Sequence, residues 1–317
     1  MKIKNFFPGL LYILCPLALF LIIGCSNKKE IPAEGFVKVK GGKVWYRING
    51  ERNNTPILIL HGGPGSSSYG QEPLKELSDQ WPVVFYDQLG SGRSDRITDT
   101  TFMRVARYVE EVEQVRKELN FEKVYLYGQS WGTALSLEYY LRFPEHVKGI
   151  IFSSPYFSTK LWMKDAKKLV KTLPDSIQTI IRTNEKNKTF ENQEYKDAVS
   201  LFYSKFLRRK ERSQAKKDTS AMYFGSNVYE FMWGPSEFTA TGSLLDYDRI
   251  NDLSEIKVPV LFITGEYDEA TPATVKLYQR QVSDARFQEI SNSGHATLND
   301  NPEEALKAVE NFLKEIE

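Results

Sequence analysis

Short apolar runs alternate with longer amphipathic segments over most of this chain. The runs are rich in β-branched and aromatic side chains and lie at 56–60, 82–87, 124–127, 148–154, 258–264 and 287–290. Runs of this kind are typical of strands buried on both faces of a parallel sheet. The segments between them, such as 104–119, place apolar side chains on one face and charges on the other, as a helix at a sheet surface does. The pattern predicts a mostly parallel α/β sheet flanked by helices.

The rhythm changes between residues 156 and 247. Strand-like runs disappear there, and the lysine-rich segments 161–173 and 194–212 have helical composition. Because acidic residues are interspersed with the lysines, we expect solvated helix faces rather than a polyanion-binding surface. We therefore predict an inserted helical cap at 156–247, between two parts of the core at 35–155 and 248–317.

Residues 1–24 have the pattern of a secretory signal, with two lysines before a nearly uncharged apolar run at 6–23. The segment Leu21-Ile22-Ile23-Gly24-Cys25 resembles a bacterial lipobox, in which cleavage precedes a cysteine that then receives lipid. We therefore expect a lipid anchor at Cys25 and a polar tether at 25–34. The predicted location is the cell envelope, where the exported protein is held at a membrane.

An uncleaved membrane helix is the alternative for the same segment. About 18 apolar residues nearly suffice to span a bilayer. Pro8, Gly9 and Pro16 interrupt the run and disfavour a continuous helix.

Charge and composition exclude several classes of protein. The 42 basic and 41 acidic residues balance, so no nucleic-acid partner is expected. The two cysteines are Cys15 and Cys25, so a mature chain lacking Cys15 forms no internal disulfide and no cysteine-based metal site. Three histidines are too few for a histidine-rich metal site, and no cofactor motif is visible. We expect neither a metal nor a cofactor.

Candidate chemistry begins where the strand at 124–127 ends. The next residues, Gly128-Gln129-Ser130-Trp131-Gly132, form a Gly-x-Ser-x-Gly motif and are followed by good helix formers. A cramped strand–turn–helix of this kind lifts the serine hydroxyl above the sheet, and the Trp131 amide then points to where an oxyanion forms. The alternative is a plain turn whose small residues allow close packing.

A second glycine-rich loop, His61-Gly62-Gly63-Pro64-Gly65, follows the strand at 56–60. Glycines let a ligand approach main-chain amides, and the C-terminal ends of strands are where α/β folds place their sites. We expect Gly63 to supply the second oxyanion-hole amide and His61 to make a structural hydrogen bond. A plain Gly/Pro turn is the alternative.

Asp268 and His295 also follow predicted strands, so both should lie at the same sheet edge as Ser130. The order Ser130, Asp268, His295 is the nucleophile, acid and base order of α/β hydrolases. His295 would take the proton from Ser130, and Asp268 would fix the tautomer of His295. Asp87 is the rival acid because it too ends a strand, but it precedes the serine.

Five motifs occur in order, at 61–65, 86–94, 128–132, 233–238 and 265–268. As a set they resemble the prolyl iminopeptidase family of serine peptidases, from about residue 35 to the C-terminus. The resemblance implies the α/β-hydrolase fold with a helical cap. It also implies release of N-terminal residues, often proline, from short peptides with a free N-terminus.

The same resemblance implies two substrate-binding carboxylates, Glu237 and Glu269. An aminopeptidase must recognise an ammonium group, and partly buried carboxylates do so by charge-assisted hydrogen bonds. The alternatives are a helix-capping carboxylate for Glu237 and a surface charge for Glu269. Many strict prolyl iminopeptidases carry arginine where Leu89 stands, so the chain looks more like the branch that accepts various N-terminal residues.

Two other functions remain open at this point. An esterase or lactonase would use the same triad on uncharged acyl substrates, and Glu237 and Glu269 distinguish it from a peptidase. A non-catalytic binding lipoprotein would not require an intact triad. Epoxide hydrolases and dehalogenases are excluded, because their nucleophile is an aspartate and Ser130 occupies that position.

Overall fold

The computed structural model describes residues 1–5 and 31–317. Most of the predicted signal segment, together with Cys25, lies outside the described residues. The chain divides into two units, 1–31 and 32–317. Residues 1–5 form no helix or strand, and every named element belongs to the second unit. Within the described ranges, no helix has both the length and the apolar character needed to cross a membrane.

An eight-stranded sheet lies at the centre of the second unit, in the order β1-β2-β4-β3-β5-β6-β7-β8. β1 pairs antiparallel with β2, and β2 antiparallel with β4, whereas all other neighbours are parallel. The predicted, mostly parallel α/β sheet is therefore confirmed. In chain order the strands are β1 (Glu34–Val39), β2 (Gly42–Asn49), β3 (Ile57–Leu60), β4 (Val83–Tyr86), β5 (Val124–Gln129), β6 (Val147–Ser153), β7 (Val260–Gly265) and β8 (Ala285–Ile290).

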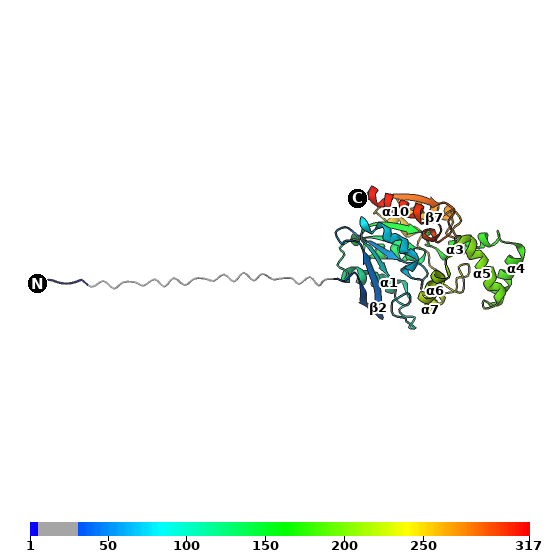
Figure 1. Cartoon of the computed structure of the whole chain (residues 1–317), viewed down its shortest axis with the longest axis horizontal. Helices are drawn as coiled ribbons and strands as arrows, with labels where there is room; N and C mark the ends of the chain where they lie inside the picture. Colours follow the sequence, from blue (N-terminus) through cyan, green and yellow to red (C-terminus); the bar gives the residue numbers. More distant parts are fainter. Residues whose placement is uncertain (6–30) are drawn as a thin grey trace. The chain divides into compact units, whose positions relative to one another are not determined.

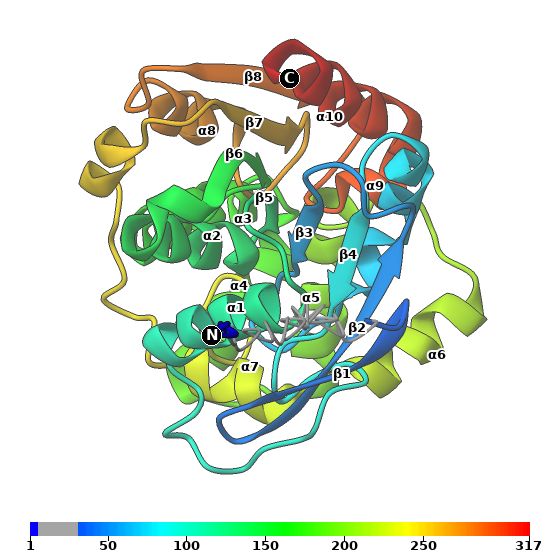
Figure 2. The same cartoon turned by 90° about the vertical axis from the view of Figure 1, so that its left-hand side faces the viewer.

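Helices cover both faces of this sheet (Figure 2). One face carries α1 (Val105–Glu118), α2 (Trp131–Arg142) and α8 (Pro272–Gln279), and the other carries η1 (Ser68–Asp79), α9 (Thr297–Asp300) and α10 (Pro302–Ile316). Two further 3₁₀ turns are η2 (Pro144–His146) and η3 (Asn251–Glu255). Leu74 of η1 and Phe312 of α10 belong to one apolar core with β3, β4 and β5. Burial of these apolar side chains between the layers fixes the ends of the strands, where the candidate site lies.

Part of the charged side of α1 is buried. Glu111, Glu113 and Arg116 are all buried. Glu113 forms an ion pair with Arg116 at 2.8 Å and accepts a 2.8 Å hydrogen bond from the hydroxyl of Tyr139 on α2. These charged side chains are buried because α2 packs against α1.

Five helices separate β6 from β7 in the sequence and gather at one side of the core (Figure 1). Three of them share an apolar core of their own, to which they contribute Ala166, Ile181 and Phe202. We refer to these five helices as the cap. The five helices are α3 (Thr159–Val170), α4 (Asp175–Asn187), α5 (Gln193–Phe206), α6 (Gln214–Tyr223) and α7 (Ser226–Met232).

Candidate active site

Ser130 lies at a sharp turn between β5 and α2. Its backbone has φ 53° and ψ −122°, a conformation that non-glycine residues rarely adopt. Its N–H donates to the Ser153 carbonyl at 3.0 Å, and its own carbonyl accepts from the Thr133 N–H at 2.8 Å. Strain held by surrounding structure in this way is typical of a functional residue.

The two glycines of the motif serve close packing rather than the turn angle itself. A Cβ on Gly132 would lie 1.9 Å from the Leu60 carbonyl oxygen, and one on Gly128 would lie 2.4 Å from the Gly132 oxygen. Helix α2 can therefore approach β3 and β5 only with glycine at both positions. This close approach places the Ser130 side chain at the end of the sheet.

Asp268 and His295 are in direct contact. Nδ1 of His295 lies 2.8 Å from Oδ1 of Asp268, and both side chains are buried. The Asp268 carboxylate also accepts from the Ala270 N–H at 2.8 Å and from the Gly265 N–H at 3.2 Å. A carboxylate held by several donors keeps one orientation, and it therefore fixes the imidazole ring and its tautomer.

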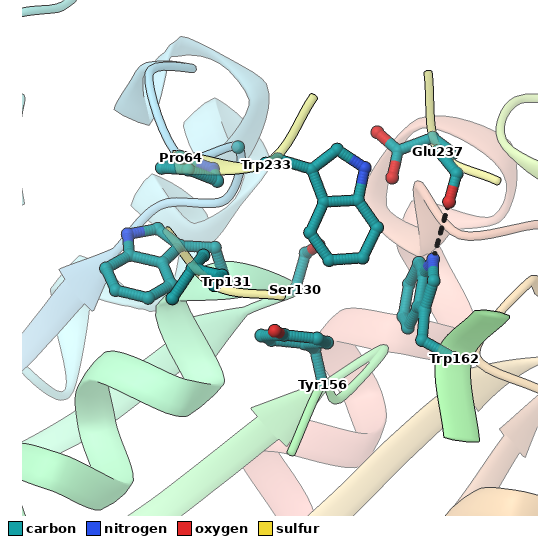
Figure 3. Close-up of a pocket in the computed structure, with 9 residues that line it drawn as sticks. Pro64, Ser130, Trp131, Tyr156, Trp162, Trp233 and Glu237 are labelled. Carbon is teal, nitrogen blue, oxygen red and sulfur yellow. Dashed lines mark hydrogen bonds between the residues drawn. The ribbon is translucent and has the colours of Figure 1, made fainter. Parts of the chain in front are cut away.

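The end of β6 connects the serine to the histidine. Ser153 accepts the Ser130 N–H through its carbonyl, and the next residue, Ser154, donates from Oγ to the His295 carbonyl at 2.9 Å. The ring of Trp162 packs edge-on against His295, with centroids 5.5 Å apart, and lines one pocket with Ser130 (Figure 3). The structure thus brings Ser130, Asp268 and His295 to one edge of the sheet.

Gly63 and Trp131 line the same pocket as Ser130. Trp131 is the first residue of α2, and Gly63 has φ 117°, which favours glycine. Across residues 31–317, the backbone N–H of neither residue donates a hydrogen bond within the protein. Two free amides beside the hydroxyl, one of them at a helix N-terminus, suit a developing negative charge.

His61 and Asp87 are occupied elsewhere. Nδ1 of His61 contacts the Gly62 carbonyl at 2.9 Å and Nε2 accepts the Gln88 N–H at 2.9 Å, so the expected structural hydrogen bond is confirmed. Burial lowers the pKa of His61, which favours the neutral ring that this pairing requires. Asp87 accepts hydrogen bonds from Ser68 and forms a 2.9 Å ion pair with Arg93. It is a structural acid.

Glu237 and Glu269 both lie near His295, but in different settings. Glu237 lines the pocket after the end of α7, and its Oε1 accepts a 2.8 Å hydrogen bond from the Tyr229 hydroxyl. Because it begins no helix, the helix-capping alternative is wrong. Glu269 is only 1% exposed, so the surface-charge alternative is wrong too. Its Oε1 lies 3.9 Å from Nδ1 of His295.

The electrostatics of these two carboxyls differ from those of ordinary glutamates. Burial raises the pKa of Glu237. Burial also raises the pKa of Glu269 well above its usual range, and the negative charges of Glu237 and Asp268 raise it further. Neither carboxylate oxygen of Glu269 has a hydrogen-bond partner in the described part of the chain. A buried, unpaired acid of this kind strongly favours a cation that could enter beside it.

The remaining pocket walls are apolar and mostly aromatic, as Figure 3 shows. Tyr156 packs edge-on against Trp233 and Trp162, with centroid distances of 5.5 and 5.8 Å. Pro64 and Leu244 complete the lining. The sequence pattern alone does not identify Tyr156 and Trp162 as pocket residues. The sequence signal that could have identified Tyr156 is its position three residues after the strand that ends at Ser153, because sites in α/β folds lie at strand ends.

Among the described residues, no cluster of His, Cys, Asp and Glu could hold a metal ion.

Comparison with known proteins agrees with this geometry. The family described as "alpha/beta hydrolase fold" matches residues 55–302. The chain belongs to the α/β hydrolase family. Within that family, it is 41% identical over 285 residues to the proline iminopeptidase of Heyndrickxia coagulans, covering 89% of this chain and 99% of the relative.

Two solved structures resemble this α/β hydrolase over about nine-tenths of the chain. The crystal structure of VinJ superposes with a TM-score of 0.85 at 31% identity, covering 90% of this chain and 99% of VinJ. The proline iminopeptidase of Mycobacterium smegmatis superposes with a TM-score of 0.81 at 28% identity, covering 89% and 98%.

Proposed function

We propose that this α/β hydrolase is a serine aminopeptidase. It releases N-terminal residues, proline or a broader set, from short peptides through an acyl-enzyme intermediate. One observation carries the proposal: Glu269 is buried beside the His295–Asp268 pair, and neither of its carboxylate oxygens has a hydrogen-bond partner among the described residues. The likeness to a proline iminopeptidase over most of the chain supports it.

The residues at the pocket account for acyl transfer. Oγ of Ser130 attacks the carbonyl carbon of the first peptide residue as His295 takes the hydroxyl proton. The N–H groups of Gly63 and Trp131 then donate to the tetrahedral oxyanion. His295 gives its proton to the leaving amine, and a water molecule repeats the sequence on the ester to free Ser130. Asp268, 2.8 Å from Nδ1, stabilises the imidazolium.

Glu237 and Glu269 account for recognition of a free N-terminus. The ammonium of the first residue would bind between the two carboxylates, which removes the unfavourable state of an unpaired buried acid. An N-acetylated peptide carries no ammonium and leaves the acids unpaired, so it should be rejected strongly. The aromatic walls around Tyr156 and Trp233 suit an apolar first side chain, including the ring of proline.

The experiment is a panel of Xaa-naphthylamides and short peptides, each with and without N-acetylation. Wild type should turn over the free amines and reject the acetylated forms. Glu237→Gln and Glu269→Gln should each raise KM for free amines by about tenfold or more, since one charge-assisted contact is lost. Glu255→Gln is the matched control, because Glu255 is an exposed glutamate. If both site variants keep wild-type KM while acyl esters are turned over, the enzyme is an esterase or lactonase.

We also propose that the exported protein is held at a membrane of the cell envelope by lipid on Cys25. The lipobox-like segment at 21–25 supports this. Each buried methylene stabilises anchoring by about 0.8 kcal/mol, so more than one acyl chain would hold the protein firmly. Labelled fatty acid should be incorporated into wild type and into Cys15→Ala but not into Cys25→Ala. Equal labelling of all three would reject the lipid anchor.

A further inference from the structure

Gln88 lies two residues after the end of β4, in the loop 88–95 to which the proposed chemistry assigns no role. It is only 1% exposed. Its side-chain Nε2 donates to the His61 carbonyl at 2.9 Å, and its side-chain Oε1 accepts from the indole N–H of Trp131 at 2.9 Å. Its backbone N–H donates to Nε2 of His61, also at 2.9 Å. One residue thus contacts two segments that are 70 positions apart in sequence.

These two segments carry the proposed oxyanion donors. His61 stands two residues before Gly63, and its ring contacts the intervening Gly62 carbonyl. Trp131 supplies the other donor from its own backbone. We propose that Gln88 is a positioning residue that sets the separation of the two oxyanion-hole amides. The inference rests on the proposed serine hydrolase chemistry.

The amide group of glutamine is suited to this task because it is planar and has one donor end and one acceptor end. The donor end matches the carbonyl of His61, and the acceptor end matches the indole N–H of Trp131. A glutamate would keep the acceptor but place a charge against the His61 carbonyl. A methionine would fill a similar volume and make neither hydrogen bond.

Side chains of α1 hold the loop that carries Gln88 in place. The N–H of Leu89 donates to the buried carboxyl of Glu111 at 3.2 Å, and the Tyr108 hydroxyl donates to the Leu89 carbonyl at 3.1 Å. Tyr108 also packs edge-on against Trp131, with centroids 6.0 Å apart. These contacts fix Gln88 relative to the core. Gln88 in turn positions the segments that contain Gly63 and Trp131 through its hydrogen bonds to His61 and Trp131. Such support is what a preorganised site requires.

The test is Gln88→Met, measured with an aminoacyl naphthylamide and with two inhibitors. Misplaced oxyanion donors stabilise the transition state less well but do not affect binding of the substrate. We therefore expect kcat to fall about 10- to 100-fold while KM changes by less than about twofold. An aminoacyl aldehyde, which forms a tetrahedral adduct with Ser130, should bind more weakly by the same factor as kcat/KM falls. The matching amino alcohol forms no adduct and should bind unchanged.

Gln71→Met is the matched control, because Gln71 is a buried glutamine of η1 outside the pocket lining. It should keep wild-type kcat and aldehyde affinity. If Gln88→Met does not fold, Gln88→Glu is measured in its place, since it retains the acceptor for the indole but replaces the donor to His61 with a charged oxygen.

The outcomes separate the inference from the proposed function. Wild-type kcat and aldehyde affinity in a Gln88 variant overturn the positioning role alone. Equal weakening of the aldehyde and the amino alcohol also overturns it, because the residue would then merely support the pocket. If wild type itself shows no tight aldehyde binding and no active-site labelling by a fluorophosphonate, the serine hydrolase function fails first.

Discussion

The backbone N–H of His295 donates a 2.9 Å hydrogen bond to the carbonyl oxygen of Phe206, the last residue of cap helix α5. The next residue, Ala296, repeats the contact with the Leu207 carbonyl, also at 2.9 Å. Earlier in α5, the Tyr195 hydroxyl donates to Ser236, which directly precedes Glu237. Helix α5 therefore contacts both the loop that carries His295, the proposed base, and the segment that carries Glu237, a proposed ligand of the substrate ammonium.

Asp300 strengthens this connection, and its removal should lower activity from a distance. Its carboxylate accepts 2.9 Å hydrogen bonds from the backbone N–H groups of Arg209, Lys210 and Gly294. Asp300→Ala should let the His295 loop shift against the cap and lower kcat/KM about 10- to 100-fold, because small misplacements are costly in catalysis. The measurement is steady-state kinetics with an aminoacyl naphthylamide. Asp246→Ala, at an exposed position, is the control, and equal kcat/KM in the two variants would contradict the expectation.

Ammonium binding should weaken at acidic pH through Glu269. Burial and the charges of Glu237 and Asp268 raise its pKa, so Glu269 takes up a proton at a higher pH than an ordinary glutamate. A protonated carboxyl no longer attracts an ammonium, so affinity should fall as pH falls through that raised pKa. The inhibition constant of an amino alcohol, measured between pH 4 and 8, should show this loss in wild type. Glu269→Gln should bind weakly with a flatter profile, and identical profiles would exclude Glu269.

Glu111 should make the protein less stable as pH rises from 5 to 8. Burial raises its pKa from 4.5 to about 8, although the Leu89 N–H opposes the rise. Between these two values the folded state keeps a proton that the unfolded state has lost. The free energy of unfolding therefore falls with rising pH, by at most about 1.4 kcal/mol per pH unit from this group, and the loss is complete above the folded pKa.

Glu111→Gln isolates that contribution, since a neutral amide does not titrate. Urea unfolding at pH 5, 6, 7 and 8 should show the variant gaining stability relative to wild type at each step. A constant difference between the two proteins at all four values would show that Glu111 does not titrate as expected.

Alanine at Gly132 should damage both stability and activity. The added Cβ would lie 1.9 Å from the Leu60 carbonyl oxygen, so β3 and the glycine loop after it must shift. Overpacking of this kind costs about 1–3 kcal/mol, which thermal unfolding can measure. Gly70→Ala is the matched control, because a Cβ there meets nothing within 4 Å. The expectation fails if the two variants unfold at the same temperature.

Ser130→Ala should abolish turnover without unfolding the protein. Loss of the nucleophile should lower kcat by about 10⁴-fold or more, as it does for residues that act as one catalytic unit. A fluorophosphonate should label wild type and leave the variant unlabelled, with circular dichroism confirming the fold. Substantial turnover by the alanine variant would remove Ser130 from the mechanism.

The strands and the turn at Ser130 could be predicted from the sequence because they depend on local pattern. Apolar runs at Ile57–Leu60 and Val260–Gly265 predict buried strands from their composition alone. The Gly-x-Ser-x-Gly spacing predicts the turn at Ser130, which the structure places between β5 and α2. Each of these features is decided within about ten residues of chain.

Only the tertiary structure decided which charges are buried and what holds the site. Nothing near Glu111 in the sequence distinguishes it from a surface glutamate, because its burial comes from segments far along the chain. The contacts of Gln88 with Trp131 and of His295 with Phe206 join positions 43 and 89 residues apart. Local pattern specifies helices and strands through backbone and side-chain periodicity. Desolvation and long-range hydrogen bonding depend on how those elements pack.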